Sequence, residues 1–249
     1  MSDADWKNDE KTKVDVKEDP VARLHDYHLD VQNNHLYLFP WQELAATDTY
    51  GWAEPGVEYT MANKVIMNMR LAMTINPNKP LMIHMKTCGG LWEEGMAIFD
   101  MLLCYPYDTT ILSYTHARSM SSIIFQAATK RVMMPHSTFM FHDGTYGDEG
   151  TYKQVKTAID FYEKVGSVMM DIYVFRMMQR GEHSHKTEKQ IRKMLRDMMD
   201  KKEDVYLTAQ EAVSWGLADE VFNGNWSNLT NYSTECHEHG QAFAAEFLK

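Results

Sequence analysis

Cysteine is scarce in this 249-residue chain, and its three cysteines form no even, closely spaced set. This usage excludes a disulfide-stapled secreted fold and is typical of a reducing compartment. The chain also lacks the run of ~18 apolar residues that a membrane span needs. Its first ten residues are acidic, without the apolar core of a secretory signal or the arginines of a transit peptide. We therefore expect a cytoplasmic protein that does not enter a membrane.

The sequence also has fewer basic than acidic residues. The 25 Lys and Arg residues face 35 Asp and Glu residues, which gives a net charge of −10, and no dense basic patch lies beside aromatic residues. Nucleic acids and anionic membranes both require a basic surface, so we expect neither as the main partner. No Gly-x-x-x-x-Gly-Lys-Ser/Thr run is present either, so the sequence contains no phosphate-binding loop of that kind.

What the chain does contain is an ordinary globular mixture in which strand and helix patterns alternate. We expect a mobile charged tail over residues 1–20, one folded domain over residues 21–222 and a C-terminal extension over residues 223–249. Strands are predicted at residues 35–39, 81–85, 109–114, 131–134, 138–142 and 203–207, and helices at residues 59–74, 93–104, 120–128, 152–180, 187–199 and 208–216. The alternation predicts an α/β fold with a largely parallel sheet, whose strand ends carry the chemistry.

Ser119 stands where a polar, turn-like segment, residues 115–118, meets an apolar helix-forming run. A serine at this junction lies beside the free N–H groups and the positive end of a helix dipole. That setting suits a nucleophile, because the same N–H groups can stabilise the charge that the reaction generates. It equally suits an N-cap, which is the commoner role of serine. The residue alone leaves both roles open.

Two other predicted strand ends carry residues that complement this serine. His142 closes the strand at residues 138–142, and Gly89-Gly90 follows the strand at residues 81–85. A serine, a histidine base and backbone N–H donors are the minimum set for acyl transfer, and a glycine pair lets the backbone approach a carbonyl oxygen. Taken singly, His142 also suits a half-buried structural imidazole, and the glycine pair suits a simple strand-to-helix turn.

Four segments, in this order, carry a resemblance to a known family. Residues 86–90 read Lys-Thr-Cys-Gly-Gly, residues 117–120 read Ala-Arg-Ser-Met, residues 135–142 read Pro-His-Ser-Thr-Phe-Met-Phe-His, and residues 203–219 read Glu-Asp-Val-Tyr-Leu-Thr-Ala-Gln-Glu-Ala-Val-Ser-Trp-Gly-Leu-Ala-Asp. They resemble the Gly-Gly element, the nucleophile motif, the segment before the catalytic histidine and the aspartate-bearing segment of the Clp protease proteolytic subunit, a self-compartmentalising serine peptidase. The resemblance covers about residues 30–222.

This resemblance implies a crotonase-like, ClpP-like fold: a superhelix of repeated ββα units with a long handle helix at residues 152–180. It also implies the activity, an ATP-dependent type of serine endopeptidase. By the resemblance, Ser119 is the nucleophile, His142 is the general base and then the general acid, and Asp204 orients the imidazole.

The resemblance assigns the remaining site residues by position. The N–H groups of Gly90 and Met120 are expected to form the oxyanion hole, and Gly90, Trp92 and Thr145 are expected to bind an extended substrate strand. No cofactor and no metal is implied. The implied partners are polypeptide substrates, further copies of the chain in heptameric rings stacked in pairs, and an AAA+ unfoldase ATPase.

The sequence also departs from the family pattern. Arg118 replaces a small residue beside the nucleophile and is expected to line the site, Ser121 and Ser122 replace Gly and Ala, and Cys88 replaces a proline. The loop over residues 45–56 and the C-terminal segment look additional. These departures favour a divergent branch of the family. By analogy, one such branch is a phage-encoded head-maturation protease that acts in the host cytoplasm.

Three alternatives stay open at this level. A crotonase-type enzyme acting on acyl-CoA thioesters also uses backbone N–H donors, although the ordered Ser, His and Asp count against it. A non-catalytic ring subunit is suggested by the altered surroundings of Ser119. A metal site at Cys236-His-Glu-His239 is disfavoured, because ligands so close in sequence fit a closed zinc site poorly.

Overall fold

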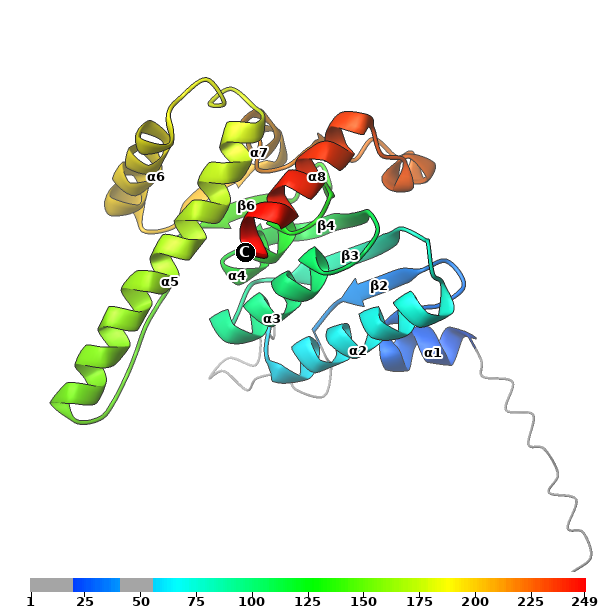
Figure 1. Ribbon diagram of the computed structural model, residues 1–249, viewed down its shortest axis with the longest axis horizontal. Helices are drawn as coiled ribbons and strands as arrows, with labels where there is room; N and C mark the ends of the chain where they lie inside the picture. Colours follow the sequence, from blue (N-terminus) through cyan, green and yellow to red (C-terminus); the bar gives the residue numbers. More distant parts are fainter. Residues whose placement is uncertain (1–19, 41–55) are drawn as a thin grey trace, which may run out of the picture.

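The computed structural model describes residues 20–40 and 56–249 as a mixed α/β fold (Figure 1). The expected tail lies outside the described residues up to residue 19, and so does the expected loop except for Gly56. None of the described helices is long and apolar enough to cross a membrane.

The elements follow one another as the sequence patterns indicate. The helices are α1 (Pro20–Tyr27), α2 (Tyr59–Ile75), α3 (Trp92–Leu103), α4 (Met120–Gln126), α5 (Tyr152–Gln179), α6 (Glu188–Lys202), α7 (Ala209–Ser214), the 3-10 helix η2 (Trp226–Thr230) and α8 (Thr234–Phe247). The strands are β1 (Leu29–Asp30), β2 (His35–Leu38), β3 (Leu81–Thr87), β4 (Thr109–Arg118), β5 (Lys130–Met133), β6 (Thr138–Phe141), β7 (Val205–Thr208) and β8 (Glu220–Val221). Helix α1, strands β1 and β8 and the 3-10 helix η2 were not predicted, and the segment that forms α8 was expected only as a C-terminal extension.

The strands form one sheet in the order β1-β2-β3-β4-β5-β8, and β6 continues beside β4 and pairs with β7. Strands β2, β3, β4, β5 and β8 run parallel to one another. Strand β1 is antiparallel to β2, and β7 is antiparallel to β6. The main core lies between the sheet and helices α2 to α5, and a smaller cluster on the other face packs against η2. The predicted fold class, α/β with a largely parallel sheet, is confirmed.

Strand β4 is longer than predicted, and the interpretation of residues 115–118 as a turn is wrong. The strand changes partner along its length: Thr110–Ser113 pair with β5, and His116–Arg118 pair with β6. Ala117 in the second part is fully buried. The polar composition of these residues does not indicate this strand, which pairs with β6, 22 residues downstream, on one side and with Thr87 of β3 on the other. Ser119 therefore follows the strand directly.

Helix α5 divides into two halves with different surroundings. Figure 1 shows its N-terminal half extending beyond the sheet. Buried side chains in α5 begin at Val165, whereas Ile159 is 53% exposed and the neighbouring Phe161 46%. The ring of Tyr146 stacks on that of Tyr162, with 4.3 Å between their centres, whereas Ile159 stays exposed because this part of the helix leaves the core.

The C-terminal segment does not stand apart from the core. Helix α8 packs beside α5, and Phe243 is fully buried within the same apolar cluster as the sheet. The guanidinium of Arg176 lies 3.7 Å from the centre of the Phe243 ring. Packing is therefore continuous across residue 222.

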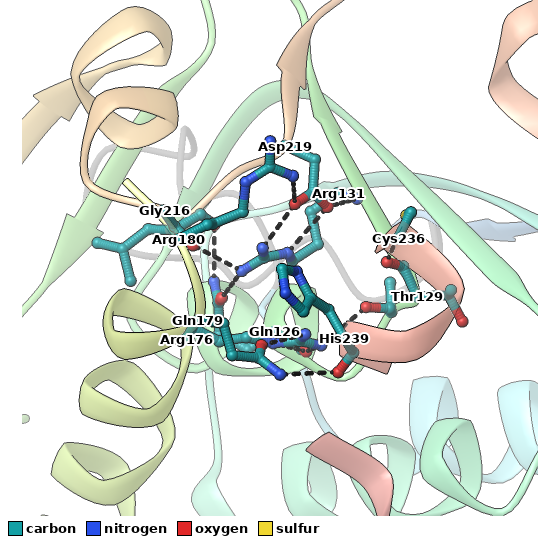
Figure 2. Close-up of polar contacts among 12 residues, drawn as sticks. Gln126, Thr129, Arg131, Arg176, Gln179, Arg180, Gly216, Asp219, Cys236 and His239 are labelled. Atoms are coloured by element: carbon teal, nitrogen blue, oxygen red, sulfur yellow. Dashed lines mark hydrogen bonds and ion pairs between the residues drawn. The ribbon is translucent and has the colours of Figure 1, made fainter. Parts of the chain in front are cut away.

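A buried polar cluster joins β5, α5 and the loop before β8 (Figure 2). Arg131 donates to Asp219 through Nη2 at 2.7 Å and through its backbone N–H at 2.7 Å, and Arg180 Nη1 donates to Asp219 at 2.8 Å. Arg176 donates to the carbonyls of Gln126 and Ala128. Each of these groups is paired, as buried charges require.

Candidate active site

The backbone of Ser119 makes a sharp turn between β4 and α4. Its φ of 50° and ψ of −130° lie in a region that non-glycine residues rarely adopt and that costs about 1–3 kcal/mol. Its N–H donates to the carbonyl of Met140 at 3.1 Å, which fixes the turn against β6. Although Ser119 stands at the N-cap position of α4, its side chain makes no capping hydrogen bond. The hydroxyl is directed elsewhere.

That hydroxyl lies within hydrogen-bond reach of His142. The distance from Ser119 Oγ to His142 Nε2 is 2.8 Å, and the distance from His142 Nδ1 to Asp204 Oδ1 is 3.1 Å. The His142 side chain is 22% exposed and that of Asp204 45%. The three side chains thus form one continuous hydrogen-bonded series that opens to solvent at the carboxylate.

Strand β6 creates this arrangement through its pairing on both sides. Arg118 of β4 is in register with Met140, and Val205 of β7 is in register with Phe141. Ser119 directly follows β4, His142 directly follows β6 and Asp204 directly precedes β7, so the three residues lie at adjoining ends of three neighbouring strands. A shift of one residue in either pairing would turn the histidine to the opposite face of the sheet.

The glycine pair lies against the serine. Gly89 has a φ of 112°, and a Cβ added there would be 2.7 Å from Ser119 Cβ. Gly90 bridges Val57 in the parallel sense: the Val57 N–H donates to the Gly89 carbonyl, and the Leu91 N–H donates to the Val57 carbonyl at 2.9 Å. In such a bridge the N–H of Gly90 points away from Val57.

Met120 supplies a second N–H beside the serine. It is the first residue of α4, so its N–H has no partner within the helix. Together, Gly90 and Met120 place two backbone donors at the rim of the same cleft. Such donors can stabilise an oxyanion that forms next to the serine.

The cleft has a volume of about 550 Å³. Its rim includes Ser119, His142, Gly90, Trp92 and Thr145, so all of the residues expected to bind substrate line it. Its apolar wall is formed by side chains of α4 and α5, namely Met120, Ile123, Phe161, Tyr162, Val165, Met169 and Tyr173. Trp92 begins α3, so the extended backbone available for strand pairing ends at Leu91.

Arg118 does not line the cleft, contrary to expectation. Its guanidinium donates to Thr138 Oγ1 at 2.9 and 3.1 Å and lies 5.3 Å from the centre of the Tyr206 ring. Alternation along β4 explains this, because the side chains of successive strand residues point to opposite faces.

Ser121 and Ser122 are both fully buried. Ser121 Oγ donates to the Thr87 carbonyl at 2.8 Å, and Ser122 Oγ contacts the Tyr173 hydroxyl at 2.7 Å. Tyr173 was missed from the sequence, because it stands in the apolar pattern of a long helix and nothing local marks it as a site residue.

The Cys-His-Glu-His segment is engaged in other contacts. Cys236 Sγ donates to the Thr129 carbonyl at 3.1 Å, and burial raises the pKa of its thiol to about 11. His237 Nδ1 lies 2.8 Å from Asp108 Oδ1. Within residues 20–40 and 56–249, no three His, Cys, Asp or Glu side chains come together as a metal site.

A serine, a histidine and an aspartate linked in this order beside backbone N–H donors form the arrangement of serine hydrolases. Comparison with known proteins agrees. The family model described as Clp protease matches residues 52–225, and the chain belongs to this family. The ATP-dependent Clp protease proteolytic subunit of Deinococcus radiodurans is 28% identical over 174 residues, which cover 69% of this chain and 79% of that protein. The predicted resemblance is confirmed, and the chain is a serine peptidase of the Clp type.

Proposed function

We propose that this peptidase hydrolyses polypeptides through Ser119, His142 and Asp204. The observation that carries the proposal is the continuous series of hydrogen bonds from the serine hydroxyl through both imidazole nitrogens to the carboxylate. Each contact is within the distance over which a proton can be transferred or an imidazole oriented.

The reaction then follows from the positions of the groups. His142 Nε2 accepts the hydroxyl proton as Ser119 Oγ attacks the peptide carbonyl, and Asp204 holds the Nδ1–H and stabilises the imidazolium. The N–H groups of Gly90 and Met120 receive the developing oxyanion. His142 next gives its proton to the leaving amine, and a water molecule, activated by the same histidine, releases the acyl group from the serine.

The cleft indicates how the substrate lies. An extended peptide adds its backbone beside Gly90 and Leu91 on one side and near Thr145 on the other, by strand addition. The side chain that precedes the cleaved bond enters the apolar wall at Val165 and Met169, and Trp92 contacts the peptide through its indole ring.

The proposed assembly is a homo-oligomer of heptameric rings stacked in pairs, which encloses the clefts and acts with an AAA+ unfoldase in the cytoplasm. Two observations support it: the first half of α5 carries uncovered apolar side chains such as Ile159 and Phe161, and the Clp protease family includes a relative named as an ATP-dependent proteolytic subunit. Residues 21–222 would be the peptidase domain, and residues 223–249 an extension packed onto it.

The test compares the wild-type protein with Ser119→Ala. Hydrolysis of a fluorogenic peptide should fall at least about a thousandfold, and labelling by a fluorophosphonate should disappear. Ser184→Ala, at an exposed loop serine, is the matched control and should keep both. Labelling that survives in Ser119→Ala would contradict the assignment. Intact rings with neither labelling nor hydrolysis in the wild type would instead favour a non-catalytic subunit.

A further inference from the structure

We propose that Ser122 and Tyr173 are positioning residues that fix the orientation of the Ser119–Met120 peptide, and with it the Met120 N–H. The inference rests on the proposed function, because it concerns the N–H donor assigned there to the oxyanion. It adds two residues that do not touch the reacting atoms but control a group that does.

The hydrogen bonds on the Ser119 carbonyl define a directed series. Ser122 Oγ donates to this carbonyl at 2.6 Å, and the Ser122 N–H donates to it at 3.0 Å. A serine hydroxyl has one proton, and that proton is used on the carbonyl. The Tyr173 hydroxyl, 2.7 Å away, must therefore be the donor to Ser122 Oγ. The series runs from Tyr173 through Ser122 to the Ser119 carbonyl.

The orientation of this carbonyl decides where the next N–H points. The peptide unit between Ser119 and Met120 is planar, and in a trans peptide the C=O and N–H point in opposite directions. Two donors on the carbonyl thus hold the Met120 N–H toward the cleft. They also polarise the peptide unit, because hydrogen bonds in series strengthen one another by about 10–30% per bond.

The surroundings of the series keep competing water out. Ser122 is fully buried and Tyr173 is 1% exposed. Burial also raises the pKa of the Tyr173 hydroxyl, so that it remains a donor. The rarely adopted backbone conformation of Ser119 persists only where neighbouring groups hold it, and these two side chains supply part of that restraint.

Tyr173 also connects the nucleophile to the strand that carries His142. Its ring centre lies 5.8 Å from that of Phe141, the residue before the histidine, and 6.1 Å from that of Phe139. A serine bonding back to the carbonyl three residues earlier is common at helix starts and by itself needs no catalytic meaning. Such local bonding does not explain why the Ser122 hydroxyl also contacts Tyr173 of α5, which is 51 residues away.

The experiment uses Ser122→Ala, Tyr173→Phe and the double variant in the assembled protein with a fluorogenic peptide. For Ser122→Ala we expect kcat to fall about tenfold, with KM within about twofold of the wild type. Removing an oxyanion donor altogether lowers kcat by a factor of about 10²–10³, and in this variant the donor is present but less firmly oriented. Tyr173→Phe should lower kcat less. The double variant should match Ser122→Ala, because the tyrosine acts through the serine.

A peptide aldehyde provides the readout that a structural role would not move. Its adduct with Ser119 places an oxyanion beside the Met120 N–H, so its inhibition constant should rise by the same factor by which kcat/KM falls. The control is Ser113→Ala, which removes another fully buried serine pair of the same sheet, with Ser137 at 3.0 Å. It should lower the thermal midpoint without changing kcat.

Two results would overturn the inference. One is an unchanged kcat in Ser122→Ala and Tyr173→Phe, whatever their stability; the other is full additivity of the two changes in the double variant. If Ser122→Ala does not fold, Tyr173→Phe keeps the ring packing and tests the same series. Hydrolysis that survives in Ser119→Ala would overturn the proposed function itself, which distinguishes the two failures.

Discussion

Removing the charge of Asp219 should destabilise this fold far more than removing a surface carboxylate. The Asp219 side chain is 9% exposed and that of its partner Arg131 is 2% exposed. Burial alone would raise the pKa of Asp219, but Arg131, and after it Arg176 and Arg180, lower it to about 2. The carboxylate is therefore the ion-pair partner of Arg131 and Arg180, and its charge also acts on the nearby guanidinium of Arg176.

Asp219→Asn keeps the size of the side chain and leaves these cations without their counter-charge. Breaking one partner of a buried ion pair costs about 3–5 kcal/mol. In a chain of this length each kcal/mol lowers the thermal midpoint by about 2–4 °C, so the expected loss is about 6–20 °C. Thermal unfolding followed by circular dichroism at pH 7 and fixed protein concentration measures it.

The pH dependence gives the same prediction a second measurement. A carboxylate whose folded-state pKa is depressed contributes stability above its unfolded value of 3.8 and loses it as the pH falls through about 2. The wild type should lose about 2 kcal/mol over that range on this account, and Asp219→Asn should not.

The matched control is Asp197→Asn. Its partner Lys193 is 2.7 Å away but 74% exposed, and such a pair contributes about 0.5 kcal/mol or less. Its midpoint should stay within about 2 °C of the wild type. If Asp219→Asn is no less stable than Asp197→Asn, the reasoning about the buried cluster is refuted.

Two further predictions concern His84 in the sheet and the turn at Ser119. Burial, and after it His35, lowers the pKa of His84 to about 4, so His84 stays neutral in the folded state while the unfolded imidazole titrates near 6.5. This contribution to the free energy of unfolding should be fully present above pH 6.5 and should fall by about 3 kcal/mol toward pH 4. Urea unfolding of His84→Phe should lack this part of the decline. Identical pH profiles of wild type and variant would contradict the prediction. Gly89→Ala should lower hydrolysis at least about tenfold, because its Cβ would strike Ser119 Cβ at a strained φ of 112°. Gly224→Ala, at a φ of 90° with open space around it, should keep full activity, and equal losses in both variants would show that the clash is not the cause.

Local patterns in the sequence predicted most of the elements. The helix expected at residues 152–180 is observed as Tyr152–Gln179, and the helices expected at residues 187–199 and 208–216 begin at capping boxes formed by Thr187 and Thr208. These features depend on residues a few positions apart, so periodicity and capping chemistry encode them directly.

The partners within the candidate site were harder to predict. Ser119 and His142 could be suspected as strand ends, but Asp204 was assigned only by resemblance. Its contact with His142 arises from the antiparallel pairing of β6 with β7, between residues 62 positions apart. The pairing of Ser122 with Tyr173 is equally non-local. No spacing rule within a segment reports which side chains such pairing brings together.

The pairing of β7 with β6 has a consequence for biosynthesis. A chain made only as far as residue 200 contains Ser119 and His142 but lacks Asp204, which in the proposed mechanism orients the imidazole. Long-range pairing of this kind forms late, because the intervening loop must close before the contacts are gained. If the proposed mechanism holds, full hydrolytic activity depends on completion of the fold, and a subunit truncated before the strand Val205–Thr208 should hydrolyse peptides on the order of 10⁴-fold more slowly.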